Sequence, residues 1–283
     1  MGPMPRATAN GIELEYQVFG DEQDPALLLI AGLGAQMLSW DDDFCRLLAA
    51  QGFRVIRFDN RDVGHSTWMD DDGAGEYSLD DMAADAAALL DALGISAAHV
   101  VGASMGGFIA QLVALNHPAK VLTLTSIMSG PNGADQVRPT EDGTAVLMVP
   151  APDTREERIA VGMWAKQKLM GPDDPFDRDY EERRIIAALD RAYHPAGFVR
   201  QLQAIMAAQG RLARLAQLRV PALVIHGDAD ILVPVDNGRN VAAAIPGARL
   251  IEIQGMGHDL PKRVWPQVVE AIAELARHAS PAC

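Results

Sequence analysis

Short apolar runs recur along the chain and predict the strands of one sheet. Residues 12–18 alternate apolar and polar side chains, as a half-buried strand does, whereas residues 26–32 are continuously apolar. Continuously apolar strands are typical of a sheet that is covered on both faces. Further strands are expected at residues 53–59, 99–103, 121–128, 222–227 and 249–253.

Helical patterns fill the intervals between these runs. Ser78 stands at an N-cap position before an apolar helical pattern, and Gly94 lies just past its end. Strands that alternate with helices indicate βαβ units, so the predicted fold class is α/β, with a mostly parallel central sheet and helices on both faces. Other helices are expected at residues 39–51, 105–117, 236–245 and 261–278.

One interval breaks this alternation. Residues 131–218 offer no good buried strand, and they open with a stretch that is rich in Pro and Gly. Further on, Thr154 and Glu157 have the spacing of a capping box ahead of a helical pattern. We therefore expect residues 131–218 to form a helical cap, and residues 1–130 and 219–283 to form the two parts of one core domain.

A serine lies between a predicted strand and a predicted helix, in the stretch GASMG at residues 102–106. Taken alone, this G-x-S-x-G pattern is also consistent with a plain glycine-rich turn. In its strand–turn–helix context it predicts a sharp turn that exposes the hydroxyl of Ser104 at the carboxyl edge of the sheet. Ser104 is therefore the candidate nucleophile, provided that partners for it exist elsewhere.

A serine nucleophile needs a base, and the base needs a carboxylate that orients it. Asp228 and Asp230 follow the strand at 222–227, and His258 follows the last strand. Because the carboxyl ends of parallel strands meet at one edge, we expect Ser104, Asp230 and His258 to form a catalytic triad. Asp230 is favoured over Asp228 because it stands further from the strand, whereas Asp228 is placed to bind the turn backbone.

When a serine attacks a carbonyl group, the carbonyl oxygen becomes an oxyanion, which needs two N–H donors. One belongs to the residue after the nucleophile, here Met105, and the other is expected in the loop after an early strand. In that loop Gly32 and Gly34 leave the backbone open around Leu33. The backbone N–H groups of Leu33 and Met105 are therefore the predicted oxyanion hole.

Charge and composition exclude several other classes of function. The 283-residue chain has a formal net charge of −14, which argues against nucleic acid and against anionic membrane surfaces as partners. It shows no signal-peptide pattern and no apolar stretch long enough to span a membrane. Its two cysteines, Cys45 and Cys283, form neither a disulfide framework nor a zinc motif. We expect a cytoplasmic protein without a bound metal or cofactor.

These motifs make the chain resemble the α/β-hydrolase superfamily over nearly its whole length. Asp59 and Arg61 are expected to organise the loop of the motif at residues 58–66, FDNRDVGHS. Two positions depart from the usual family pattern, because Asp62 replaces a Gly and Ala31 stands where many members carry His. The resemblance rests on AGLGAQ (31–36), FDNRDVGHS (58–66), GASMGG (102–107), HGDADILVP (226–234) and GMGHDLP (255–261).

Within the superfamily the motifs are most similar to small bacterial carboxylesterases, including methylesterases that act on anthracycline polyketides. The resemblance implies a helical cap inserted after the sixth strand. It also implies that a carboxylic ester of a small, largely apolar molecule is hydrolysed through an acyl-enzyme. Candidate walls of the substrate pocket are Gly32, Met128, Trp164, Val233 and Leu260.

Several alternatives remain open on the sequence. The same triad serves lactone hydrolysis, C–C bond hydrolysis and perhydrolase or haloperoxidase-type reactions. A non-catalytic receptor for small molecules is a different class of function on the same fold, and the complete set of triad residues disfavours it.

Overall fold

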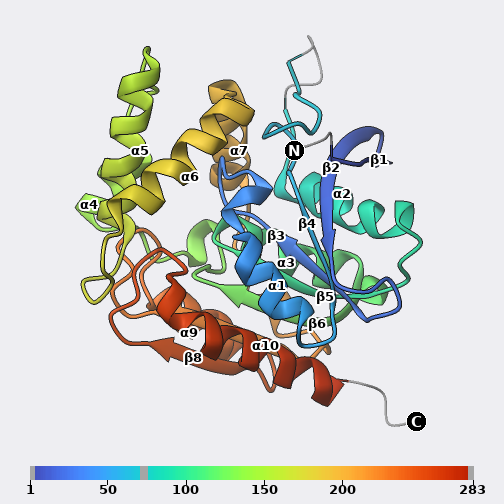
Figure 1. Ribbon diagram of the computed structural model, residues 1–283. Helices are drawn as coiled ribbons and strands as arrows, with labels where there is room; N and C mark the ends of the chain where they lie inside the picture. Colours follow the sequence, from blue (N-terminus) through green and yellow to red (C-terminus); the bar gives the residue numbers. More distant parts are fainter. Residues whose placement is uncertain (1–3, 71–75, 280–283) are drawn as a thin grey trace.

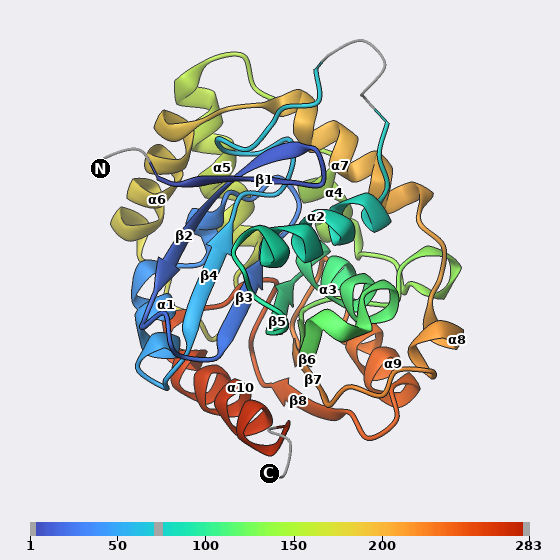
Figure 2. The ribbon, with the colours of Figure 1, turned by 90° about the vertical axis from the view of Figure 1, so that its right-hand side faces the viewer.

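An eight-stranded sheet forms the centre of the computed structural model, which describes residues 4–70 and 76–279. The spatial order of the strands is β1-β2-β4-β3-β5-β6-β7-β8, and all pairs from β4 to β8 are parallel (Figure 2). The strands are β1 (Arg6–Ala9), β2 (Ile12–Phe19), β3 (Ala26–Ile30), β4 (Arg54–Phe58), β5 (Ala98–Ala103), β6 (Val121–Ile127), β7 (Ala222–Gly227) and β8 (Arg249–Ile253). The predicted α/β class and mostly parallel sheet are confirmed.

Strand β1 is the one strand that the hydrophobic pattern did not predict. Its four residues, RATA, carry too little apolar surface to stand out, and it pairs antiparallel with β2 at the edge of the sheet. Cys283 lies outside the described residues, whereas Cys45 is a buried free cysteine.

Helices cover both faces of the sheet (Figure 2). One face carries α1 (Asp42–Ala49) and α10 (Trp265–Ala279), and the other carries α2 (Leu79–Ala92), α3 (Met105–Asn116) and α9 (Asp236–Ala244). The helix expected at 39–51 begins later, because the Asp41 side chain caps α1 by accepting the Asp43 N–H. Ser78 caps α2 as predicted, with a complete capping box.

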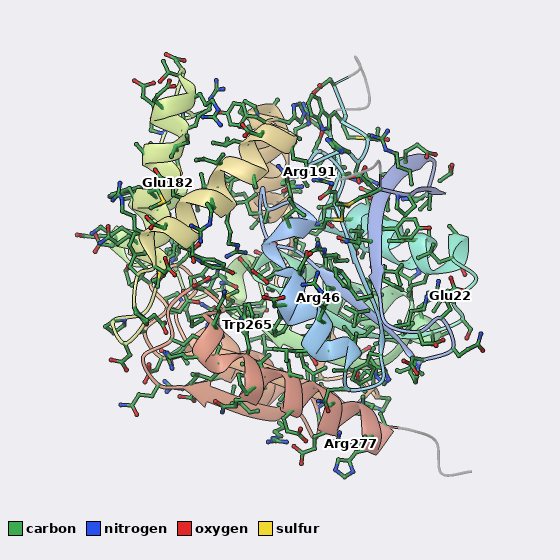
Figure 3. All side chains as sticks on the ribbon, viewed as in Figure 1. Glu22, Arg46, Glu182, Arg191, Trp265 and Arg277 are labelled. Atoms are coloured by element: carbon green, nitrogen blue, oxygen red, sulfur yellow. The ribbon has the colours of Figure 1, made fainter. Side chains whose placement is uncertain are left out.

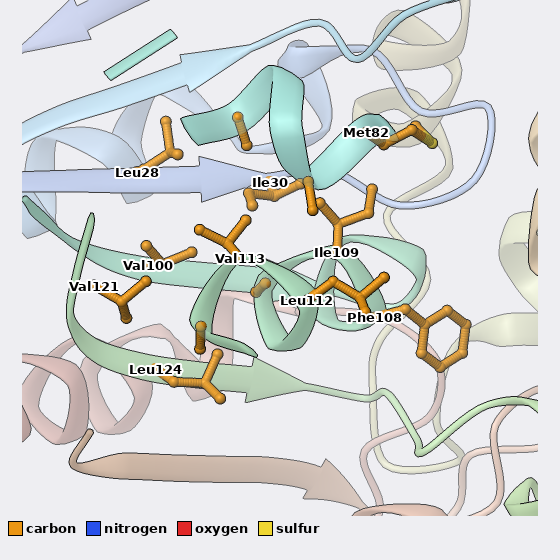
Figure 4. Close-up of a cluster of buried hydrophobic side chains, with 14 of the residues drawn as sticks. Leu28, Ile30, Met82, Val100, Phe108, Ile109, Leu112, Val113, Val121 and Leu124 are labelled. Carbon is orange, nitrogen blue, oxygen red and sulfur yellow. The ribbon is translucent and has the colours of Figure 1, made fainter. Parts of the chain in front are cut away.

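Helix α3 is apolar nearly all round because it is enclosed on all sides. Ile109 and Val113 belong to one buried cluster with Ile30 of β3 and Val100 of β5, all four of which Figure 4 labels. Helix α2 covers a further side of α3. The tight packing of α3 against the sheet places the turn before it, which contains Ser104, at the edge of the sheet.

Five helices come between β6 and β7, in the interval for which a helical cap was predicted. They are α4 (Glu141–Leu147), α5 (Arg155–Leu169), α6 (Arg178–Arg191), α7 (Pro195–Ala207) and α8 (Leu212–Leu215). Residues 128–221, all of which the structure describes, contain helices and loops and no strand. The capping box of Thr154 and Glu157 begins α5. In Figure 1, α5, α6 and α7 project from the end of the molecule opposite α10.

Side chains tie these helices to the core. Arg191, labelled in Figure 3, ends α6 where this helix meets the N-terminal strands. Its guanidinium donates to the Gln36 side chain at 2.6 Å and also binds the carboxylate of Asp59. Among the described residues, no helix has the length and the apolarity needed to cross a membrane.

Candidate active site

The candidate nucleophile lies on a strained turn between β5 and α3. Ser104 has a φ of +55°, a conformation that non-glycine residues rarely adopt. The turn requires small neighbours, because a Cβ at Gly102 would lie 2.0 Å from the Gly106 carbonyl oxygen. A Cβ at Gly106 would in turn lie 2.1 Å from the carbonyl oxygen of Ile30 on β3. The glycines of the motif therefore allow the helix to approach the sheet closely.

The structure brings together the three side chains predicted as a triad. His258 Nε2 lies 2.9 Å from Ser104 Oγ, and His258 Nδ1 lies 2.7 Å from Asp230 Oδ2. An ionised carboxylate only accepts hydrogen bonds, so the proton resides on Nδ1 and Nε2 is free to accept the serine proton. The three groups come from the carboxyl ends of β5, β7 and β8, as expected from the parallel sheet.

Asp230 is buried and is held as an anion. Burial by itself would raise its pKa, but the interactions with His258 and His226 and the N–H of Val233 outweigh burial and hold the pKa well below its usual range. The other carboxylate oxygen accepts the N–H groups of Leu232 at 2.9 Å and Val233 at 2.8 Å. Asp230 is therefore both charged and fixed in orientation.

Asp228, the alternative acid, has a different partner. Its Oδ1 accepts the Gly255 N–H at 2.7 Å and so joins the two loops that carry the acid and the base. The geometry favours Asp230 as the partner of His258.

Two backbone segments adjoin the serine. Met105 is the first residue of α3, so its N–H has no acceptor within the helix. Gly32 lies against the nucleophile, since a Cβ on it would be 3.3 Å from the Cβ of Ser104. Leu33 follows Gly32 and lines the cavity at the serine. The loop after β3 and the start of α3 thus enclose one side of the Ser104 hydroxyl.

Comparison with known proteins agrees with this fold. The profile of the alpha/beta hydrolase fold family matches residues 25–261. The chain belongs to this family. It is 35% identical to rhodomycin D methylesterase DauP of Streptomyces sp. strain C5, over 98% of this chain and 99% of the relative. It is 34% identical to rhodomycin D methylesterase DnrP of Streptomyces peucetius, with the same coverage. A solved structure of a hydrolase from Pseudomonas aeruginosa superposes with a TM-score of 0.74 at 27% identity, covering 99% of both chains.

The α/β-hydrolase motif at 58–66 builds a loop beneath the cap. Asp59 accepts the N–H groups of Met37 at 2.7 Å and His65 at 3.1 Å, so its side chain joins two loops. Arg61 forms a buried bidentate pair with Asp85 at 2.6 and 2.7 Å. Both contacts fit the organising role expected for Asp59 and Arg61.

The departure at Asp62 has a structural reason. This residue has a φ of +70°, which explains why glycine is usual at the position. The Asp62 carboxylate gains a bidentate pair with Arg200 of α7, both bonds being 2.8 Å. The side chains of Asp62, Asp70 and His194 also lie within 4.8 Å of one another, but Arg200 already binds both carboxylates. The cluster therefore anchors α7 to the core.

A cavity of about 310 Å³ lies between the cap helices and the edge of the sheet, and Ser104 and His258 open into it. Three of the candidate wall residues, Gly32, Met128 and Leu260, line it. Its remaining walls are largely apolar or aromatic, including Trp40, Phe44, Leu147, Leu169, Phe198 and Trp265, the last labelled in Figure 3. The charged side chains of Asp41, Lys166, Arg184 and Asp259 also line it, and Lys166 binds Asp259 at 2.6 Å.

Two predicted wall residues lie elsewhere. Trp164 faces a separate hollow on the outer side of α5 and α6, because Lys166 and Leu169 occupy the face of α5 that adjoins the cavity. A residue two positions before Lys166 lies on the other side of a helix. Val233 is buried behind the site, where its carbonyl oxygen binds His226 at 2.7 Å, and the adjacent Leu232 lines the cavity instead.

The sequence patterns did not indicate the aromatic walls. Trp40 and Phe44 belong to the segment before and within α1, where helical periodicity marks an apolar face but not the cavity that this face adjoins. Phe198 and Gln201 lie on α7, far along the chain from the loops that they contact. No local signal distinguishes such contacts from ordinary helix packing.

Proposed function

We propose that this protein is a carboxylic ester hydrolase that acts through Ser104, His258 and Asp230. The observation that carries the proposal is the continuous hydrogen-bond chain of these three side chains at the mouth of a cavity. Two full-length relatives that are named as methylesterases support the same class of reaction.

In the proposed reaction His258 Nε2 takes the Ser104 proton while Ser104 Oγ bonds to the ester carbonyl carbon. His258 then gives this proton to the departing alcohol as the C–O bond breaks, which leaves an acyl-enzyme. Water repeats the two steps and releases the acid. Asp230 keeps the imidazole in the required tautomer and stabilises its charged form.

The negative charge that develops on the carbonyl oxygen needs donors that are already in place. We assign this role to the backbone N–H groups of Leu33 and Met105, which adjoin Ser104 on one side. A single donor of this kind contributes about 3 kcal/mol to transition-state stabilisation in serine hydrolases. The assignment needs no side-chain donor, which fits the presence of Ala31 in place of the usual His.

The substrate is proposed to be a methyl ester of a largely apolar acid. The apolar and aromatic walls of the cavity support the apolar acid, and the two methylesterase relatives support the methyl group. A neighbouring cavity of about 710 Å³, which Leu147 and Phe198 also line, is proposed to accommodate a bulky acyl half.

The proposed function is tested by labelling with a fluorophosphonate, followed by mass spectrometry. We expect one covalent adduct at Ser104 in the wild type and none in Ser104→Ala. A panel of methyl, ethyl and p-nitrophenyl esters then measures turnover. A wild type with neither an adduct nor turnover contradicts the proposal and favours a non-catalytic receptor.

The same panel separates the alternative reactions. Lactones, vinylogous diketones for C–C bond cleavage, and peroxide with a carboxylic acid are assayed beside the esters. Among the substrates without an activated leaving group, we expect kcat/KM to be highest for methyl esters. A higher value for a lactone or a diketone keeps the triad chemistry but replaces the proposed substrate.

A further inference from the structure

Gln201 is a fully buried amide on helix α7 of the cap. Its Oε1 accepts the Gly34 N–H at 2.8 Å, and its Nε2 donates to the Arg61 carbonyl oxygen at 2.8 Å. Only one orientation of the amide makes both bonds, because the carbonyl cannot donate and the amino group cannot accept. The side chain therefore bridges the loop after β3 and the loop after β4, with a defined geometry at each end.

The first of these contacts is next to the proposed oxyanion hole. The Gly34 N–H belongs to the peptide that directly follows Leu33. Phe198, one turn before Gln201 on α7, packs on the same glycine, and a Cβ at Gly34 would lie 2.7 Å from its ring. Helix α7 thus fixes the plane of the peptide beside the one that carries the Leu33 N–H.

The peptide on the other side of the Leu33 N–H, between Ala31 and Gly32, is also held. Asn60 Nδ2 donates to the Ala31 carbonyl oxygen at 3.1 Å, which fixes the peptide before Gly32. The Gly32 carbonyl oxygen accepts the Ala35 N–H at 3.2 Å and closes the turn. The donor of Leu33 is therefore flanked by two supported peptides, one held from within the core and one held by the cap.

We propose that Gln201 is a positioning residue for the oxyanion hole, and that α7 thereby forms part of the catalytic apparatus. This inference rests on the proposed function, because it assumes that Leu33 donates to the oxyanion. A donor acts fully only when it is about 3 Å from the place where the charge develops. Loss of its support weakens transition-state binding more than substrate binding, and so lowers kcat more than it changes KM.

The test is Gln201→Leu, assayed with a p-nitrophenyl ester and with a phenylboronic acid. The boronic acid forms a reversible tetrahedral adduct with a serine, and one of its oxygens occupies the oxyanion hole. We expect kcat to fall roughly 10- to 100-fold with KM within about threefold of the wild type, and the boronate Ki to rise in parallel. A purely structural role would leave the boronate Ki in proportion to KM.

The matched control is Gln203→Leu, the same substitution at an exposed position of the same helix, which we expect to behave as the wild type. Gln201→Met keeps the length of the side chain and serves as a second variant if Gln201→Leu does not fold. A folded variant of Gln201 with kcat within twofold of the wild type overturns the proposal, as does a loss of kcat with an unchanged boronate Ki.

Failure of this inference is distinguishable from failure of the proposed function. A wild type that labels at Ser104 and hydrolyses esters, together with a fully active Gln201→Leu, rejects the positioning role alone. A wild type that neither labels nor hydrolyses esters rejects the proposed function and, with it, the role of Gln201.

Discussion

The two halves of the candidate site are held in different ways. In the half that contains the triad, main-chain groups of the core hold the nucleophile and the acid. The Ser104 N–H donates to the Ile127 carbonyl oxygen at 2.9 Å, and the Asp230 carboxylate accepts the Val233 N–H at 2.8 Å. These contacts link a residue to its own loop or to the neighbouring strand.

In the half that contains the loop after β3, side chains from elsewhere provide the support. Asn60 comes from the loop after β4, and Gln201 comes from the cap. Gln36 of the same loop donates to the carbonyl oxygens of Ala188 and Ala192 at the end of α6. The nucleophile and the acid therefore depend on the sheet, whereas the oxyanion loop depends on the core and also on how α6 and α7 are seated. Four predictions test this contrast.

The largest effect is expected from Asp230→Asn. The amide cannot hold the His258 tautomer that accepts the serine proton, so we expect kcat to fall about 10³- to 10⁴-fold. Asp228→Asn is the matched control, because its remaining oxygen still accepts the Gly255 N–H. Its kcat should stay within about tenfold of the wild type. Steady-state kinetics on one ester checks both, and a larger loss in Asp228→Asn would exchange the two assignments.

A smaller effect is expected from Asn60→Leu, which removes the support on the core side of the oxyanion loop. We expect kcat to fall roughly tenfold with little change in KM, because the Leu33 donor loses one of its two supports. Combined with Gln201→Leu, the two losses should be less than additive in free energy, since both act on one donor. A double-mutant cycle measures this coupling, and strict additivity would show that the two residues act on different features.

Arg200→Gln tests a residue that anchors α7 to the core but does not position the oxyanion loop. Arg200 precedes Gln201 on α7, but it binds the buried carboxylate of Asp62 and does not contact the oxyanion loop. We expect the free energy of unfolding to fall by about 1–3 kcal/mol, because Asp62 is left buried without its partner. Urea denaturation measures this loss. The value of kcat should stay within about threefold of the wild type, and a loss as large as that of Gln201→Leu would remove the distinction between the two residues.

The smallest effect concerns the strand that carries the nucleophile. Burial lowers the pKa of His99, at the other end of β5, from 6.5 to about 4. The unfolded chain therefore binds the proton more readily, and stability falls as the pH drops below 6.5. His99 should contribute about 1 kcal/mol of this loss between pH 7 and pH 5.5.

His99→Gln should remove that part of the pH dependence, because the amide does not titrate in this range. Urea denaturation at the two pH values measures the difference, and an unchanged slope would contradict the assignment. Activity at neutral pH should be retained, since His99 binds Thr123 and does not approach the site.

Local patterns were sufficient for the parts of the site that follow strands. Ser104, Asp230 and His258 each come just after an apolar run, and parallel strands bring such positions to one edge whatever lies between them in the chain. Gly32, Met128 and Leu260 also follow strands, and for the same reason they lie at the cavity. Strand β1 escaped detection because four weakly apolar residues leave no pattern.

Positions inside the cap were less predictable. The interval and the helical character of the cap follow from periodicity and from the capping box at Thr154. Periodicity does not show which face of α5 adjoins the site. The prediction that Trp164 lines the cavity is wrong, because Trp164 lies on the opposite side of the helix. An amphipathic helix that packs on several neighbours presents more than one apolar face, and its pattern does not say which neighbour each face contacts.

The α/β class, the sharp turn at Ser104 and the order of acid and base follow from local patterns, because each of these depends on a few adjacent residues at the end of a strand. How the oxyanion loop is supported depends instead on the way distant segments dock. Gly34 and Gln201 are 167 positions apart, and a neutral amide on a helix carries no sign of its partner until the helix is docked. Hydrogen bonds between distant segments depend on docking geometry, which short-range patterns do not encode.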